Sequence, residues 1–212
     1  MAEPLPDRRS SYRHGDLRNA LIAAGLTLAR AAGPKAVVLR EVTRRVGVVP
    51  NAAYRHFADH QALLEAVSRA ALARAAAFME EELGRVPQGG DAGLAARARV
   101  RAIGTGYLRF AQSEPGWFRT AFTVHRDLGR ADDLEGAGPG GLTPFQLLQV
   151  ALDDLQAAGL LAPERRAGAE FAAWSAVHGL AMLVLEGPLQ VLDADGRRAA
   201  ATRVLEMVEG GL

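Results

Sequence analysis

The residues best suited to chemistry lie together in the sequence NAAYRHFADH at positions 51–60. A phenol, a guanidinium and two imidazoles stand within seven positions there, at Tyr54, Arg55, His56 and His60. Such groups bind phosphate oxygens and base edges, bind metals, or act as acids and bases. The stretch is therefore part of a core, a metal or catalytic site, or a surface that binds a ligand.

Metal binding and catalysis have little support in this pattern. His56 and His60 are four residues apart, which suits two ligands on one helix, but Asp59 and a predicted helix break separate them. The other three histidines are far apart, and the chain contains no Gly-x-Ser-x-Gly elbow and no phosphate-binding glycine loop. We expect no catalytic site, no metal site and no cofactor.

Composition restricts the class of protein further. The chain has 212 residues, 49% of them hydrophobic, which suffices for one large or two small domains. The absence of cysteine excludes disulfides and thiolate zinc sites and is consistent with a reducing cytosol. The longest apolar stretch, residues 179–187, is too short to span a bilayer, and the N-terminus lacks a secretory signal. We expect a cytoplasmic protein without a membrane partner.

Charge is distributed unevenly along the chain. Residues 1–60 contain ten Arg or Lys and five Asp or Glu, a net +5, whereas the remainder carries −4. A basic N-terminal segment suggests a polyanionic partner, although an ordinary fluctuation of surface charge would look the same.

Helical periodicity extends through almost the whole chain and predicts an all-α fold. In the first third we expect a helix from residue 17 to Gly33, a short helix ended by Gly47, another at 50–57, and a fourth that is capped by Asp59. Further helices are predicted at 94–112, 144–159, 163–186 and 195–209. A longer helix followed by two short ones is the arrangement of a helix-turn-helix DNA-binding unit.

The third predicted helix has two distinct faces. Ala53 and Phe57, four residues apart, can face inward. The outward residues are then Asn51, Ala52, Tyr54, Arg55 and His56. So short a helix cannot bury Tyr, Arg and His together, but it can present them to DNA.

Two segments resemble a known family. Residues 39–67, LREVTRRVGVVPNAAYRHFADHQALLEAV, resemble the DNA-binding segment of TetR family repressors, with matches at Gly47, Tyr54, His56, Phe57, Leu63 and Leu64. Residues 107–122 and 172–189 resemble the C-terminal domain of TetR-like regulators with a Trp-x-x-x-His-Gly signature, here Trp174, His178 and Gly179.

The resemblance implies a division of labour. Residues 1–60 would form a DNA-binding domain with a flexible arm, and residues 61–212 a ligand-binding and dimerisation domain. The implied partner is double-stranded operator DNA, with Tyr54 and His56 on phosphates and Arg40 on a flanking phosphate. Nearest the bases would lie Asn51, Ala52 and Arg55.

The sequence departs from the usual family pattern in three places. Val38-Leu39 and Val49 stand where Thr or Ser commonly caps a helix, and His60, also expected near DNA, stands where Lys is common. Loss of a hydroxyl cap costs about 0.5–2 kcal/mol.

The C-terminal domain carries aromatic residues that can surround a ligand. We expect a small apolar effector, with a histidine offering one polar contact, against Phe110, Trp117, Phe118, Phe122, His125, Trp174, His178 and Met182. A closed core without a cavity is the alternative, in which His178 is a hydrogen-bonded core residue and Trp174 fills space.

Dimerisation and regulation complete the prediction. The family resemblance points to a homodimer through residues 163–186 and 195–209, with close approach at Ala169, Ala172, Ala173 and Ala176. The predicted function is a repressor released from its operator by the effector, which would move the fourth helix. The alternative is a ligand-independent dimeric DNA-organising protein.

Overall fold

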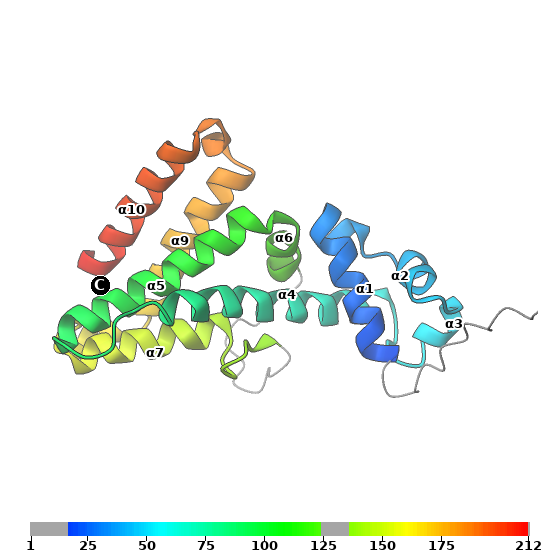
Figure 1. The fold of residues 1–212 in the computed structure, drawn as a ribbon, viewed down its shortest axis with the longest axis horizontal. Coiled ribbons are helices and arrows are strands. Elements are labelled where there is room, and N and C mark those ends of the chain that lie inside the picture. Colours follow the sequence, from blue (N-terminus) through cyan, green and yellow to red (C-terminus); the bar gives the residue numbers. More distant parts are fainter. Residues whose placement is uncertain (1–16, 124–135, 212) are drawn as a thin grey trace, which may run out of the picture.

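The computed structural model describes residues 17–123 and 136–211, and within these ranges all regular secondary structure is helical. This confirms the predicted all-α fold. A small head lies at one end of a long helix, α4, and a larger helical body surrounds the other end (Figure 1).

The head consists of α1 (Leu17–Ala32), the short 3-10 helix η1 (Pro34–Ala36), α2 (Leu39–Val46) and α3 (Pro50–Ala53). Gly47 ends α2 in the left-handed conformation, with φ of 79°, and its N–H donates to carbonyls of the last turn. Its core includes the fully buried side chains of Leu21, Val37, Val42 and Ala53. The two short helices are thereby fixed against α1.

Helix α4 (His60–Leu83) belongs to both halves of the molecule. The Asp59 carboxylate accepts a hydrogen bond from the Ala62 N–H at 2.8 Å and caps the helix as predicted. Leu63 and Val67, in its first turns, pack in the core of the head, whereas Met79 packs in the body. The predicted domain boundary at residues 60 and 61 therefore falls in the first turn of a helix that connects both cores.

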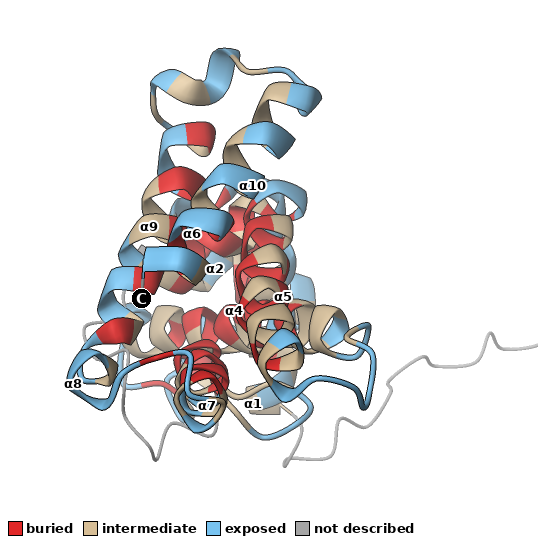
Figure 2. Cartoon of the chain, turned by 90° about the vertical axis from the view of Figure 1, so that its left-hand side faces the viewer, coloured by how far each residue is buried: buried red, intermediate tan, exposed pale blue. Residues whose placement is uncertain are grey.

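The body contains α5 (Ala92–Ser113), α6 (Pro115–Thr123), α7 (Pro144–Ala157), α8 (Pro163–Arg166), α9 (Ala169–Leu185), η3 (Pro188–Val191) and α10 (Ala194–Gly211). Helix α6 lies next to α1, and α9 and α10 form a hairpin at the far side of the body (Figure 1). Burial is concentrated on α4, α5 and α7, whereas α9 and α10 keep exposed residues along one side (Figure 2).

Two predicted helices differ from the observed ones. The helix expected at 50–57 ends at Ala53, and residues 54–56 continue as a turn. The helix expected at 163–186 is interrupted at Gly168, whose φ of 80° is outside the helical range. None of the helices in residues 17–123 and 136–211 is long and apolar enough to cross a membrane.

Candidate nucleic-acid interface and effector site

The segment that begins with α3 presents the polar face that the sequence predicts. Ala53 and Phe57 are buried in the head. Asn51 and Arg55 are exposed, Tyr54 is 54% exposed, and His56 is partly exposed. The structure confirms this division into faces, and the turn at residues 54–56 continues the outward surface beyond the short helix.

Both short helices of the head begin without a side-chain cap. Val38 precedes α2 and Val49 precedes α3, and neither can accept a hydrogen bond from the first-turn N–H groups. Val49 is 68% exposed, which is unusual for a valine in the middle of a folded segment. The donors at the start of α3 therefore lack a side-chain acceptor within the head.

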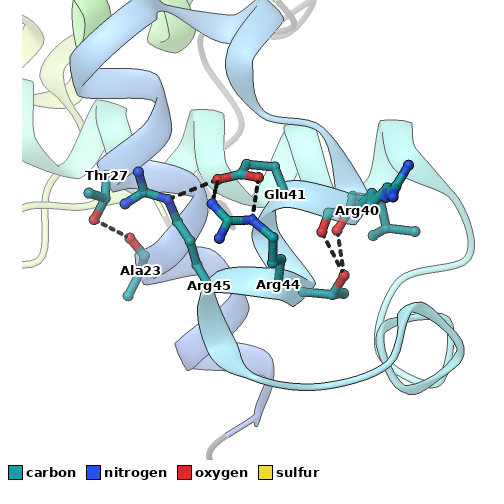
Figure 3. A network of polar contacts seen from close by, with 8 residues as sticks. Ala23, Thr27, Arg40, Glu41, Arg44 and Arg45 are labelled. Atoms are coloured by element: carbon teal, nitrogen blue, oxygen red, sulfur yellow. Dashed lines mark hydrogen bonds and ion pairs between the residues drawn. The ribbon is translucent and has the colours of Figure 1, made fainter.

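An ion-pair network covers the exposed side of α2 (Figure 3). The Glu41 carboxylate receives hydrogen bonds at 2.8 and 2.6 Å from Arg44 and lies 3.5 Å from the Arg45 guanidinium. The hydrogen bond from Arg44 is the main cause that lowers the pKa of Glu41. Arg40 is also exposed on this helix. On this helix, we expected only Arg40 to contact DNA. Arg44 and Arg45 follow Glu41 by three and four residues, and this spacing predicts their ion pairs with Glu41.

His60 is engaged within the protein. Its Nε2 atom lies 2.6 Å from the carbonyl oxygen of Val37, so this nitrogen donates the hydrogen bond. The contact joins the start of α4 to the segment before α2. The Nδ1 atom is the ring nitrogen left to meet an external group.

Five aromatic rings meet in the body where α5, α6 and α9 approach one another. Tyr107 packs against Phe118, Phe122 and Trp174 with ring centroids 5.7, 5.7 and 5.3 Å away. His178 stacks on Phe118 at 5.6 Å and meets Phe122 edge-on at 5.2 Å. These are favourable aromatic distances, so the rings form a packed cluster.

A hydrogen bond of 2.6 Å joins the Tyr107 hydroxyl and His178 Nδ1 inside this cluster. Burial raises the pKa of Tyr107 well above its usual value and lowers the pKa of His178. Both groups are therefore neutral near pH 7, and the hydrogen bond joins two uncharged side chains. His178 thus forms the hydrogen bond that we expected of a core histidine, and it also lines an open cleft.

Two hollows adjoin the aromatic cluster. A small one of about 30 Å³, lined in part by Tyr107 and Trp174, has room for about one water molecule. A cleft of about 820 Å³ lies between head and body, and Phe118, Phe122, His178 and Met182 line it. Half of the predicted effector residues thus meet at one cleft.

The other predicted effector residues have different surroundings. Phe110 is fully buried between Phe78 and Phe118. Trp117 lies apart from the cluster, because its Nε1 atom donates a 2.8 Å hydrogen bond to the Leu26 carbonyl of α1. His125 lies outside the described residues.

Trp117 belongs to a contact that joins the body to the head. The Arg30 guanidinium lies 4.9 Å from the Trp117 ring centroid and binds both oxygens of Glu114, at 2.7 and 2.5 Å. Gly116 packs directly on the last turn of α1, where a Cβ atom would lie 2.8 Å from the Arg30 carbonyl carbon and closer still to two carbonyl oxygens. Helix α6 is therefore held tightly against α1.

Helices α9 and α10 leave an apolar surface uncovered. Phe171, Leu183 and Met207 are exposed there. A Cβ atom at Gly179 would meet nothing within 4 Å. Of the four alanines that we expected at a dimer contact, Ala172 is exposed, but Ala169 and Ala173 are buried in the protomer's own core and Ala176 packs against that core. The close-approach prediction for these buried alanines was therefore wrong, because α9 turns their face inward.

The described residues contain no group of three or more His, Cys, Asp or Glu side chains that could hold a metal ion.

Comparisons with known proteins agree with both halves of this description. Residues 21–67 match the family model described as "Bacterial regulatory proteins, tetR family". Residues 100–208 match the model described as "Tetracyclin repressor-like, C-terminal domain". No protein with a curated description matches the sequence.

Solved structures with a similar fold extend along nearly the whole chain. A protein of unknown function from Rhodococcus sp. RHA1 shares 25% identity with a TM-score of 0.72, covering 96% of this chain and 99% of that one. A variant of TetR from Acinetobacter baumannii AYE, in complex with minocycline, shares 22% identity with a TM-score of 0.59, covering 91% and 94%. The fatty acid degradation regulator FadR from Bacillus halodurans shares 14% identity with a TM-score of 0.59, covering 92% and 98%.

Proposed function

Because the chain belongs to the TetR family of bacterial regulatory proteins, we propose that it is a homodimeric repressor that a small, mainly apolar effector releases from operator DNA. The family consists of DNA-binding transcription regulators rather than enzymes. The observation that carries the proposal is the exposed row of Asn51, Tyr54, Arg55 and His56 on a head with a buried core of its own.

The DNA contacts follow from this surface. Tyr54 and His56 bind phosphates, and Arg40 binds a flanking phosphate with a guanidinium that points away from the head's core. Asn51 and Arg55 read base edges, and Ala52 lies against them; a good bidentate pair contributes about 1–3 kcal/mol of discrimination. His60 contributes to DNA binding either directly, through its Nδ1 atom, or indirectly, by fixing the Val37 carbonyl in the segment before α2.

Dimerisation through α9 and α10 accounts for their uncovered apolar side. A helix-interior glycine costs about 0.5–1 kcal/mol relative to alanine, and nothing in the protomer requires Gly179 to lack a side chain. A second copy of the chain, packed closely against α9, would explain why residue 179 has no side chain. Two heads in one dimer would reach successive major grooves if they lie roughly 34–36 Å apart.

The effector enters the body beside the aromatic cluster. The hollow of about 30 Å³ is too small for more than a water molecule, whereas the cleft of about 820 Å³ falls within the usual range of roughly 300–1,000 Å³ for small-molecule sites. A structural neighbour that holds minocycline supports a small-molecule effector as a class.

Regulation requires that effector and DNA favour different positions of the head. The head joins the body through α4 and through the contact of α1 with α6, which involves Arg30, Glu114 and Trp117. An effector that moves α6 or α4 changes the separation of the two heads. Operator affinity then falls, because effector binding favours a separation of the heads that does not fit the two half-sites.

The test compares variants of the outward residues with a matched control. Tyr54→Phe and His56→Ala should weaken binding to every duplex, measured by fluorescence anisotropy, whereas Arg55→Ala should also reduce the preference for the best duplex. Arg85→Ala removes one positive charge at the far end of α4 and should leave binding unchanged. Unchanged affinity in all three head variants would refute the interface, and a dimer that binds DNA but responds to no compound would favour the DNA-organising alternative.

A further inference from the structure

We propose that the cleft between head and body binds an amphipathic monoanion, an apolar molecule with one carboxylate or sulfonate, and that Lys35 pairs with the anionic group. The proposal deepens the effector site above and rests on it for the regulatory consequence. Binding itself is a separate property that can be measured without DNA.

The cleft has one wall from each part of the molecule. The head contributes Pro34, Val38 and Leu64, from η1, the segment before α2, and α4. The body contributes Phe118 and Phe122 from α6 and Met182 from α9, beside the imidazole of His178. Apolar side chains thus face the cleft from both sides, and Val38 and Met182 are substantially exposed there. An apolar ligand body would cover surfaces that are now in contact with water.

Among the described residues that line this apolar space, Lys35 is the charged side chain without a counter-charge. Arg119 lines the cleft but forms an ion pair of 2.7 Å with Glu186, another lining residue, so their charges offset each other. His178 is neutral near pH 7, because burial lowers its pKa. The Lys35 ammonium lines the cleft and forms no ion pair or hydrogen bond with the residues of 17–123 and 136–211.

Lys35 is also the only lysine in a chain whose other basic residues are 24 arginines. Its flexible stem and compact ammonium can reach a single anionic group without the bidentate geometry that guanidinium favours. Lys35 is exposed to water, so a neutral ligand would gain nothing from its ammonium and a cationic ligand would be repelled. A dianion would find one unpaired cation among the described lining residues. The arrangement therefore fits one negative charge at the end of an apolar molecule.

A ligand held in this way would connect the two parts of the molecule. Its anionic group would contact η1, which directly precedes α2, and its apolar body would contact α6 and α9. The same α6 is fixed to α1 through Glu114 and Trp117. Occupation of the cleft would thus set the position of the head relative to the dimer-forming helices.

The first experiment uses two fluorescent probes that differ by one anionic group, anilinonaphthalenesulfonate and the neutral N-phenylnaphthylamine. Lys35→Met should weaken the sulfonate about two- to fivefold, since water screens an ion pair at an exposed lysine, while the neutral probe changes less than about 1.5-fold. Lys35→Arg should retain most of the sulfonate affinity. Arg85→Met, a remote charge loss, should affect neither probe. Unchanged sulfonate affinity in Lys35→Met, or an equal loss of both probes, would overturn the assignment.

The second experiment uses the uniqueness of the lysine. An amine-acylating reagent can modify Lys35 and the N-terminal amine alone, so mass spectrometry follows each site separately. Saturating anilinonaphthalenesulfonate should slow acylation of Lys35 severalfold and leave the N-terminal rate unchanged. Equal rates at Lys35 with and without the probe would contradict the proposal. If the probe protects Lys35 but does not alter operator affinity, the site stands and the regulatory role given to this cleft falls.

Discussion

The contact between α1 and α6 makes Gly116→Ala an informative substitution. A Cβ atom at residue 116 would lie 2.8 Å from the Arg30 carbonyl carbon, against ordinary contact at 3.4 Å or more, and closer to the carbonyl oxygens of Ala29 and Arg30. All three atoms belong to the backbone, so no side-chain rotation relieves the clash. The helices must separate by roughly 0.6 Å or more, which strains the Trp117–Leu26 hydrogen bond.

Overpacking of this kind costs about 1–3 kcal/mol. In a chain of this length each kcal/mol lowers the Tm by roughly 2–4 °C, so we expect a fall of roughly 2–12 °C in differential scanning calorimetry. Gly210→Ala is the matched control, because it adds the same methyl group to a helix where a Cβ atom meets nothing within 4 Å. It should keep or raise the Tm. If Gly116→Ala melts with or above the wild type, the tight contact between α1 and α6 is refuted.

Three further predictions follow from the described residues. Val49→Ser should raise the free energy of unfolding by about 0.5–2 kcal/mol in urea titrations, because extended Val49 occupies the N-cap of α3 without an acceptor; Val49→Ala should bring no such gain. Burial lowers the pKa of His178, so protonation of this imidazole favours the unfolded chain. The neutral imidazole therefore contributes fully to the free energy of unfolding above about pH 6.5, and this contribution is lost as the pH falls below that value toward the folded-state pKa. His178→Asn should therefore show a flatter dependence of stability on pH between about 7.5 and 5 than the wild type, and identical slopes would count against this cause. Gly179→Leu should convert the dimer to monomers in sedimentation at micromolar concentration, while a stable dimer in that variant would move the interface away from this part of α9.

The sequence carries strong local signals for the head and weaker ones for the body. Asp59 and Gly47 mark helix ends through their own conformational preferences, and both act where they were expected. The spacing of Ala53 and Phe57 indicates the buried face of residues 50–57 correctly, although the helix ends after one turn. Local chemistry decides these features, so a single sequence suffices to predict them.

The proposed effector site depends on packing between distant segments, which periodicity does not encode. Phe118 and Trp117 are neighbours in sequence, yet one lines the cleft and the other bonds to α1. Lys35 gives no sequence signal for a role in the cleft, because the residues that it faces come from α6 and α9. The alanines of α9 were assigned to the wrong face for a similar reason, since that helix is apolar on both sides.

Sequence-specific binding of operator DNA can be tested by selecting duplexes from a random DNA pool with the purified protein, followed by anisotropy with the enriched sequence. We expect a palindromic site whose half-sites lie about one helical turn apart, bound more tightly than random duplex by about a thousandfold or more at the same salt concentration. Arg55→Ala should lose most of that preference. A folded dimer that enriches no sequence, or an enriched site that Arg55→Ala and wild type bind equally well, would contradict the claim that this chain reads operator DNA through residues 51–56.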